Sequence, residues 1–284
     1  MQSIPGNVLL IVLFGAFLHA GWNALVKSDG DKFLNAVLIM VFAAVIAGSV
    51  LPFLSQPARE SWPFICLSAV LQAVYVTLIA RAYKVGDMSL AYPLMRGTAP
   101  LLVALVSLPL IGEPLPALRW LGILIVSGGI LTMAWESLLR SSSHKSTLTA
   151  ALTNACFIAA YTVTDGIGVR KSDAAIAYTL WIFVLHAVPL VAWALYKSPN
   201  ELIALVKKRP LAGFLGGFGT IGSYGAALWA MSLNVPVASV AALRETSILF
   251  AAAISFVLLK EHIGKWRLLG IAFIVCGVIV IRLS

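Results

Sequence analysis

The chain is a succession of long apolar stretches joined by short polar connections. An apolar helix of about 20 residues crosses the hydrocarbon core of a bilayer. Ten stretches have this length and are predicted to be membrane-spanning helices: 7–26, 33–54, 62–83, 88–111, 118–139, 149–169, 174–196, 211–232, 236–259 and 265–283. The connections leave no room for a soluble domain. The connection at 197–210 is basic and is expected to lie on the membrane surface.

A polar segment at 141–148 separates two halves, residues 1–140 and 149–284, with five predicted helices in each. Between the halves, residues 81–133 align without a gap on residues 229–281. The alignment pairs Arg96 with Arg244, Thr98 with Thr246, Ser107 with Ser255, Glu113 with Glu261, Arg119 with Arg267, Gly122 with Gly270 and Gly129 with Gly277. Matches of Leu or Ala are common in membrane segments, so the polar and glycine matches carry the indication of an internal repeat.

Five crossings in each half place the second half upside down relative to the first. Such inverted repeats are typical of secondary transporters, whose binding site lies near the midplane where the repeats meet. We therefore predict an all-α polytopic membrane protein with ten transmembrane helices in two five-helix inverted-topology repeats. The alternative is that both halves are unrelated apolar helices.

Composition agrees with a membrane protein, because 61% of the residues are hydrophobic and 11% are charged, whereas a soluble protein carries about 25% charged residues. The formal net charge of +9 is interpreted as loop charge that sets orientation, since no nucleic-acid motif accompanies it. Most Lys and Arg in the connections fall on the side opposite the termini, which favours termini outside the cytoplasm. Cys66, Cys156 and Cys276 lie in separate apolar stretches and are predicted to be small core residues.

Two arginines provide the strongest candidate site. Arg96 and Arg244 each lie about a third of the way into an apolar stretch, where a charge costs about 3 kcal/mol unless it faces water, a counter-ion or a ligand. We predict that both line one central polar cavity, with Glu245 beside them. The alternative for Arg96 is a structural ion pair with Glu245. Pro93 and Pro100 are expected to kink the helix that carries Arg96.

Further candidate binding residues share helical faces with polar or aromatic neighbours. A helix places residues three and four positions apart on one face, and rings and amides on such a face can hold a small molecule. The candidates are His19, Trp22, Asn23, Gln72, Tyr75, Tyr92, Tyr161 and Tyr224. The alternative for each is ordinary packing or a helix–helix hydrogen bond.

Other polar residues favour structural roles. Asp165 lies near the end of its predicted helix and is interpreted as a solvated residue at the mouth of the cavity, with proton relay as the alternative. His186 is expected to belong to the interface belt and to packing. Glu113 and Glu261 are predicted to form local ion pairs with Arg119 and Arg267.

Three segments resemble the EamA-type, ten-helix branch of the drug/metabolite transporter superfamily. They are His19–Lys27, Ile111–Pro114 before Arg119, and Leu259–His262 before Arg267. Within that branch the chain resembles the YddG-type amino-acid exporters. The resemblance implies a multi-pass carrier of the inner (plasma) membrane, and its eukaryotic relatives imply cytosolic termini, so orientation stays open.

We predict a secondary transporter that exports small zwitterionic metabolites, above all amino acids including aromatic ones, by alternating access. Carriers of phosphorylated sugars or nucleotide sugars, and broad drug or metabolite exporters, are the alternatives, since arginine also suits phosphate. The chain has no P-loop, no clustered metal ligands and no catalytic serine motif, so neither an enzyme nor a cofactor or metal is expected. The expected partners are a small-molecule substrate and the lipid bilayer, not nucleic acid, and a monomer is considered.

Overall fold

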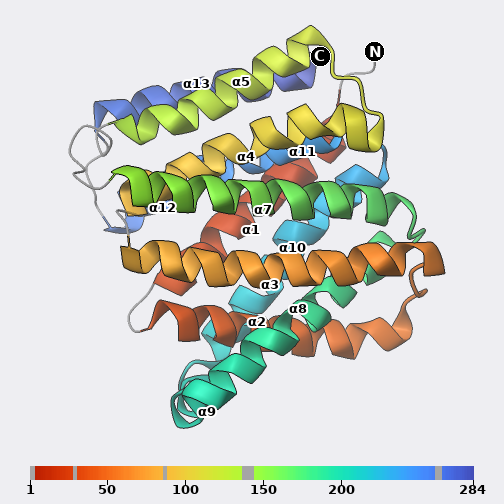
Figure 1. Cartoon of the computed structure of the whole chain (residues 1–284), viewed down its shortest axis with the longest axis vertical. Coiled ribbons are helices and arrows are strands. Elements are labelled where there is room, and N and C mark those ends of the chain that lie inside the picture. The colour runs from red at the N-terminus through yellow and green to blue at the C-terminus, as the bar shows by residue number, and fades with distance from the viewer. Residues whose placement is uncertain (1–3, 28–30, 86–87, 136–143, 260–263) are drawn as a thin grey trace.

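The structure is a computed structural model that describes residues 4–27, 31–85, 88–135, 144–259 and 264–284 (Figure 1). The described residues form helices and connections without strands. Two short 3-10 helices, η1 (Leu51–Phe53) and η2 (Arg59–Ser61), lie between α2 and α3. The α-helices are α1 (Gly6–Lys27), α2 (Lys32–Val50), α3 (Trp62–Val85), α4 (Met88–Ile111), α5 (Ala117–Met133), α7 (His144–Arg170), α8 (Ala175–Lys197), α9 (Pro199–Lys208), α10 (Pro210–Ser232), α11 (Val237–Arg244), α12 (Ser247–Leu259) and α13 (Lys265–Leu283).

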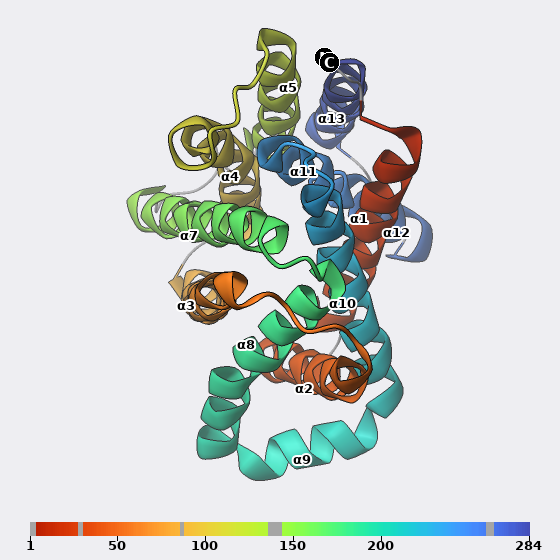
Figure 2. The same ribbon diagram turned by 90° about the vertical axis from the view of Figure 1, so that its right-hand side faces the viewer.

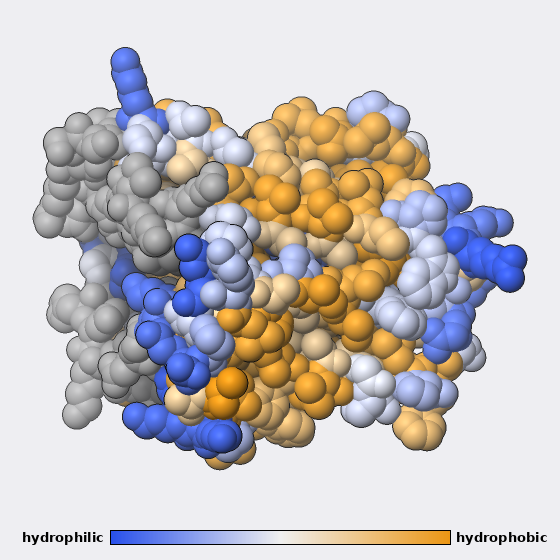
Figure 3. Space-filling view, turned by 60° about the horizontal axis from the view of Figure 1, so that its bottom comes forward, coloured by the Kyte–Doolittle hydropathy of each residue, from blue (hydrophilic) through white to orange (hydrophobic). Residues whose placement is uncertain are grey.

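The prediction of an all-α polytopic membrane protein is confirmed. Within the described residues, nine helical segments are long and apolar enough to cross a membrane, and α5 is a shorter apolar helix. The predicted continuation of α5 to residue 139 lies outside the described residues. Figure 3 shows a broad apolar band on one face with hydrophilic residues at either end, as expected for a surface that contacts lipid.

One predicted helix is interrupted. The stretch 236–259 forms two helices, α11 and α12, that are separated by a turn at Glu245 and Thr246. The Thr246 hydroxyl donates a hydrogen bond to the Leu243 carbonyl oxygen at 2.7 Å, and the Thr246 backbone N–H donates to the same oxygen. These short-range bonds replace the regular helical ladder and explain the break.

The prolines that were expected to kink α4 do not divide this helix. Pro93, Pro100 and Pro109 all lie inside one continuous helix. A proline removes one backbone hydrogen bond, but neighbouring helices can hold a membrane helix in place around it. Of the two stretches that carry the paired arginines, only the second is therefore divided in the structure.

Helices of the two halves pack against each other. The most extensive contacts join α5 to α13, α4 to α7, α1 to α10 and α3 to α7, and α2 contacts both α8 and α10. Each of these pairs takes one helix from before the 141–148 segment and one from after it. Figures 1 and 2 show α3, α7, α4 and α5 lying side by side. The halves are therefore interleaved.

Glycines bring α5 and α13 into close contact. A Cβ atom at Gly129 would lie 2.8 Å from the Gly270 carbonyl oxygen, and one at Gly270 would lie 2.5 Å from the Gly129 oxygen. In the same way, a Cβ atom at Gly122 would lie close to the Gly277 carbonyl oxygen, and one at Gly277 would lie close to the Gly122 carbonyl oxygen. Small residues allow membrane helices to approach through their backbones, so these four glycines set the separation of the pair.

The three cysteines were predicted to be core residues, and this is wrong. Cys66, Cys156 and Cys276 are exposed. In a bilayer, the outward face of a helix is as apolar as its inward face, because lipid tails replace water. Apolar surroundings in the sequence therefore do not indicate which side of the helix a small residue occupies.

The connection at 197–210 contains an amphipathic helix, α9. Leu202 is buried and packs with Leu34, Val37 and Ala194 of α2 and α8, while Lys207 and Lys208 are exposed. Figure 2 shows α9 bridging α8 and α10 at the edge of the molecule. This geometry suits a helix at the membrane surface, and the location itself stays a prediction.

Candidate functional site

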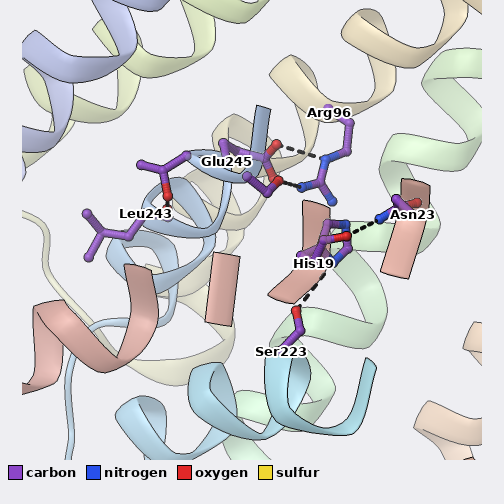
Figure 4. Close-up of polar contacts among 8 residues, drawn as sticks. His19, Asn23, Arg96, Ser223, Leu243 and Glu245 are labelled. Carbon is purple, nitrogen blue, oxygen red and sulfur yellow. Dashed lines mark hydrogen bonds and ion pairs between the residues drawn. The ribbon is translucent and has the colours of Figure 1, made fainter. Parts of the chain in front are cut away.

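Arg96 holds α4 against the break between α11 and α12 (Figure 4). The Arg96 side chain is buried, and its Nε lies 2.8 Å from Oε2 of Glu245. Its Nη2 donates a hydrogen bond to Oγ of Ser247 at 3.1 Å. The structure thus has the ion pair that was the alternative interpretation of Arg96. Direct binding of a ligand by Arg96 stays a prediction.

Arg244, the repeat partner of Arg96, has a different environment. Its guanidinium carbon lies 4.9 Å from the ring centroid of Tyr224, in cation–π geometry. The residue is half-buried. Among the described residues, no carboxylate lies within ion-pair distance of this guanidinium. Arg244 thus contacts an aromatic ring where its repeat partner contacts a carboxylate.

The candidate residues of α1 lie beside α10. His19 and Trp22 are in edge-to-face contact with ring centroids 5.2 Å apart, and Nδ1 of His19 lies 3.4 Å from Oγ of Ser223. Asn23 donates to the carbonyl oxygen of His19 in its own helix at 2.8 Å (Figure 4). The indole N–H of Trp22 is buried and lacks a hydrogen-bond acceptor among the described residues. This group could donate to a ligand.

An aromatic series joins three more candidates. Tyr161 of α7 lies between Tyr75 of α3 and Tyr224 of α10, at centroid distances of 5.8 and 6.2 Å. Phe183 of α8 extends the series and lies 6.4 Å from Tyr224. The structure therefore brings together rings from four helices, and one of them, Tyr224, contacts Arg244. Tyr92 is half-buried one helical turn before Arg96 on α4.

Sequence reasoning misjudged Asp165. This residue is 0% exposed, so the interpretation as a solvated residue is wrong. The connection before α3 covers the end of α7, where the backbone N–H of Ala58 donates to the Ser172 carbonyl oxygen at 3.0 Å. The position of Asp165 near the end of its helix predicted contact with water, but side chains of α3, α8 and α10 surround the carboxylate instead.

Three hydroxyl groups surround the Asp165 carboxylate. Oδ1 accepts a hydrogen bond from Tyr178 at 3.0 Å, and Oδ2 accepts one from Ser68 at 2.7 Å and another from Tyr224. Gln72, a predicted binding residue, donates to Oγ of Ser68 at 2.9 Å. Gln72 is thus part of the Asp165 network. Tyr178 was not predicted to belong to the site, because its place among apolar residues of α8 gave no signal that its side chain would reach α7.

His186 is buried, and neither ring nitrogen has a hydrogen-bond partner among the described residues. His186 was predicted to belong to the interface belt and to helix packing, and its burial agrees with packing. Trp193 and Lys197 of the same helix form a cation–π contact at 5.4 Å and are exposed. These two residues suit the membrane interface.

Polar contacts join helices at the end of the bundle where α4 and α7 end and the C-terminus lies, here named the terminal end. Glu113 Oε1 lies 2.5 Å from Nη2 of Arg170, and Glu113 Oε2 accepts from the backbone N–H of Val237 at 3.0 Å. Arg170 also donates to the carbonyl oxygens of Met231 and Val235, each at 3.0 Å. One ion pair thus joins the connection after α4 to the ends of α7, α10 and α11.

The predicted pairing of Glu113 with Arg119 is therefore wrong. Arg119 instead donates from Nη2 to the Ser284 carbonyl oxygen at 2.9 Å. Local spacing favoured a neighbour in sequence, whereas the inter-half packing places Arg170 closer. The corresponding prediction for Glu261 and Arg267 concerns Glu261, which lies outside the described residues.

An apolar helical bundle with charged residues and partly uncovered polar side chains between its helices is typical of a membrane transporter. The model of the EamA-like transporter family matches residues 145–283. A protein of Sinorhizobium sp. named "Uncharacterized transporter in cobO 3'region" is 30% identical over 136 residues, which cover 43% of this chain and 94% of that protein. The chain belongs to the EamA-like transporter family and is a multi-pass membrane transporter.

A protein of known crystal structure has the same fold. The similarity covers 100% of this chain and 99% of that chain, with a TM-score of 0.73 and 18% sequence identity. At this identity the likeness concerns the fold alone.

Proposed function

We propose that the protein is a secondary transporter of the inner (plasma) membrane that exports small zwitterions, above all amino acids including aromatic ones. The observation that carries this proposal is Arg244, a guanidinium without a carboxylate partner in the described part of the chain, which lies on the ring of Tyr224. Arginine binds carboxylates through two parallel hydrogen bonds.

The groups around Arg244 match further parts of an amino acid. Tyr161 and Tyr224 offer ring faces and edges to an apolar or aromatic side chain. Glu245 follows Arg244 in the chain, but its carboxylate already pairs with Arg96, so we do not assign it to the substrate ammonium group. Trp22 offers an indole N–H that lacks an acceptor within the described residues.

Charge balance favours a zwitterion over a phosphorylated sugar. Glu245 already neutralises Arg96 at 2.8 Å, so Arg244 is left to face the ligand. A phosphate monoester carries up to two negative charges near neutral pH, and its binding would be better served by two unpaired cations. Phosphorylated and nucleotide sugars therefore remain the second candidate.

Alternating access requires that one end of the pathway close while the other opens. The ion pair between Glu113 and Arg170 supplies a closure at the terminal end. In the proposed inverted repeat, each half can adopt the conformation of the other, which would open the terminal end and close the opposite end. The exchanged contacts of Gly122 with Gly277 and of Gly129 with Gly270 support such a relation between α5 and α13.

Flux through proteoliposomes tests the proposal. Vesicles preloaded with a labelled aromatic amino acid are expected to release it, whereas vesicles preloaded with a labelled sugar phosphate are not. Arg244→Gln should lower kcat/KM for the amino acid about 10- to 100-fold, the loss expected for a charge-assisted contact of about 1.5–3 kcal/mol.

The exposed Arg282 offers a matched control. Arg282→Gln removes the same charge away from the proposed site and should leave flux unchanged. Release of sugar phosphate without release of amino acid would decide for the second candidate. Normal amino-acid flux through Arg244→Gln would remove Arg244 from the binding site.

A further inference from the structure

We propose that Asp165 is a proton-binding site that couples export to proton entry, and that Tyr224 transmits its protonation state to Arg244. This inference rests on the proposed transport function. In each cycle, a proton from water on the outer side forms an O–H bond on one carboxylate oxygen. That bond breaks on the cytoplasmic side and returns the proton to water, so no electrons are exchanged.

The position of Asp165 is unusual for a structural carboxylate. The residue is 0% exposed, and its described hydrogen-bond donors are the neutral hydroxyl groups of Ser68, Tyr178 and Tyr224. A carboxylate removed from water loses its hydration, and a counter-ion or hydrogen bonds must replace it. No cationic group of the described residues lies within ion-pair distance of Asp165.

Hydroxyl donors suit a group that alternates between two forms. A hydroxyl group can donate or accept a hydrogen bond and can rotate between these roles. The ionised carboxylate accepts from all three hydroxyl groups. The protonated form can donate to one of them, for instance Ser68, after that hydroxyl hydrogen turns away. The same three hydroxyl groups can therefore form hydrogen bonds with either form of the carboxyl group.

Tyr224 connects Asp165 to the substrate site. Its hydroxyl group donates to Asp165, and the guanidinium of Arg244 lies over the ring of the same side chain. Hydrogen bonds to a charged acceptor are about twice as strong as those between neutral groups. The ionised form of Asp165 thus holds Tyr224, and with it Arg244, in the binding geometry, whereas protonation loosens both.

The charged neighbours leave Arg244 as the cation that Asp165 can balance. Among the described side chains, the titratable and charged groups on α7 and on the elements packed against it are Arg59, Glu60, Cys66, Tyr75, Tyr92, Arg96, Lys145, Cys156, Tyr161, Arg170, Tyr178, His186, Tyr196, Lys197, Tyr224 and Arg244, and Glu113 and Glu245 lie in the turns that follow α4 and α11. Lys145 and Lys197 are exposed. Arg96 pairs with Glu245 and Arg170 with Glu113, and Arg59 and Glu60 are exposed.

With Asp165 ionised, the site is neutral overall and suits a zwitterion. Protonation gives it a positive charge and loosens the binding geometry. The expected exchange is therefore one in which substrate and proton bind alternately.

Proton movement in proteoliposomes tests the coupling. With a trapped pH-sensitive dye and a labelled amino acid, the unmodified protein should move protons against the direction of substrate flow. Asp165→Asn should reduce this substrate-driven proton movement at least about tenfold, at the level of typical coupling factors. Glu60→Gln, which alters an exposed carboxylate, should leave it unchanged. Substrate flux without proton movement, or flux that follows Na⁺, would overturn the coupling while the transport function stands.

Infrared difference spectroscopy gives a test that does not depend on transport. A protonated carboxyl band that titrates with pH in the unmodified protein and is missing in Asp165→Asn is expected. Tyr224→Phe should keep the titrating band but abolish its response to added amino acid. A spectrum without a titrating band assigned to Asp165 would refute the proposal, whatever the transport assay gives.

Discussion

At the scale of single residues, the two paired arginines show how the same residue type acquires different roles. Arg96 is neutralised by Glu245 and bonded to Ser247. Arg244 rests on an aromatic ring without a carboxylate partner in the described structure. The difference arises because the break after α11 turns Glu245 toward α4. The repeat alignment could pair the two arginines but could not assign their partners.

The ion pair between Arg96 and Glu245 is expected to stabilise the folded protein. Removal of one partner from a buried ion pair leaves an uncompensated charge and costs about 3–5 kcal/mol. Glu245→Gln should therefore lower the Tm in detergent by several degrees. The double variant Arg96→Met with Glu245→Met should recover much of this loss, because both charges are removed together. A double variant less stable than Glu245→Gln would contradict the prediction.

Asp165 illustrates why part of the site was not predictable. Its position on a stripe with Tyr161 was visible in the sequence, and proton relay was considered. Its donors come from α3, α8 and α10, and only the tertiary arrangement shows that these helices meet there. A contact between residues on separate membrane helices leaves no periodic pattern in the sequence.

At the scale of elements, the length of the apolar stretches predicted nearly all the helices. Their described ends agree with the structure within a few residues, except that α7 begins at His144 rather than at 149. The predicted end of the fifth helix at 139 lies outside the described residues. The break between α11 and α12 was missed, because it depends on one side chain, Thr246, that bonds to the Leu243 carbonyl oxygen. Threonine is otherwise compatible with a membrane helix.

The close contact of α5 with α13 can be tested by substitution of Gly129, with the neighbouring Gly128 as the control position. A Cβ atom at Gly129 would lie 2.8 Å from both the Gly270 oxygen and the Phe273 Cβ atom, whereas one at Gly128 would meet nothing within 4 Å. Gly129→Val should therefore cost about 1–3 kcal/mol through overpacking. Gly128→Val changes helix propensity equally and should cost much less, as thermal unfolding in detergent can measure. Equal losses would show that the close approach is unimportant.

At the scale of the whole molecule, the halves are interleaved, and residues from both form an ion pair at the terminal end. Glu113 belongs to the first half and Arg170 to the second. The two-unit division at 141–148 and the inverted repeat stay predictions. The contacts across the division indicate that movement of one half requires rearrangement of many helix pairs, so small displacements of whole pairs are more economical than separation of the halves.

Weakening the closure should change access from the terminal end. Glu113→Gln removes the charge that pairs with Arg170, while Arg170 keeps its two carbonyl acceptors. A loss of about 1.4 kcal/mol would raise the open population about tenfold. In a background without native cysteines, Ser239→Cys, at a fully buried position of α11, should react about tenfold faster with a membrane-impermeant thiol reagent. Glu60→Gln is the control, and unchanged labelling would refute the role of this ion pair.

The pairing of Arg96 with Glu245 also has a consequence for synthesis. Arg96 leaves the ribosome long before Glu245 has been made, since domains emerge from the N-terminus onward. During that interval the arginine must enter the bilayer without its counter-ion, at a cost of about 2.5–3.5 kcal/mol on insertion scales. The fourth helix should therefore wait near the translocon or its lipid boundary until the ninth crossing arrives, and a nascent chain truncated before residue 245 should insert that segment poorly.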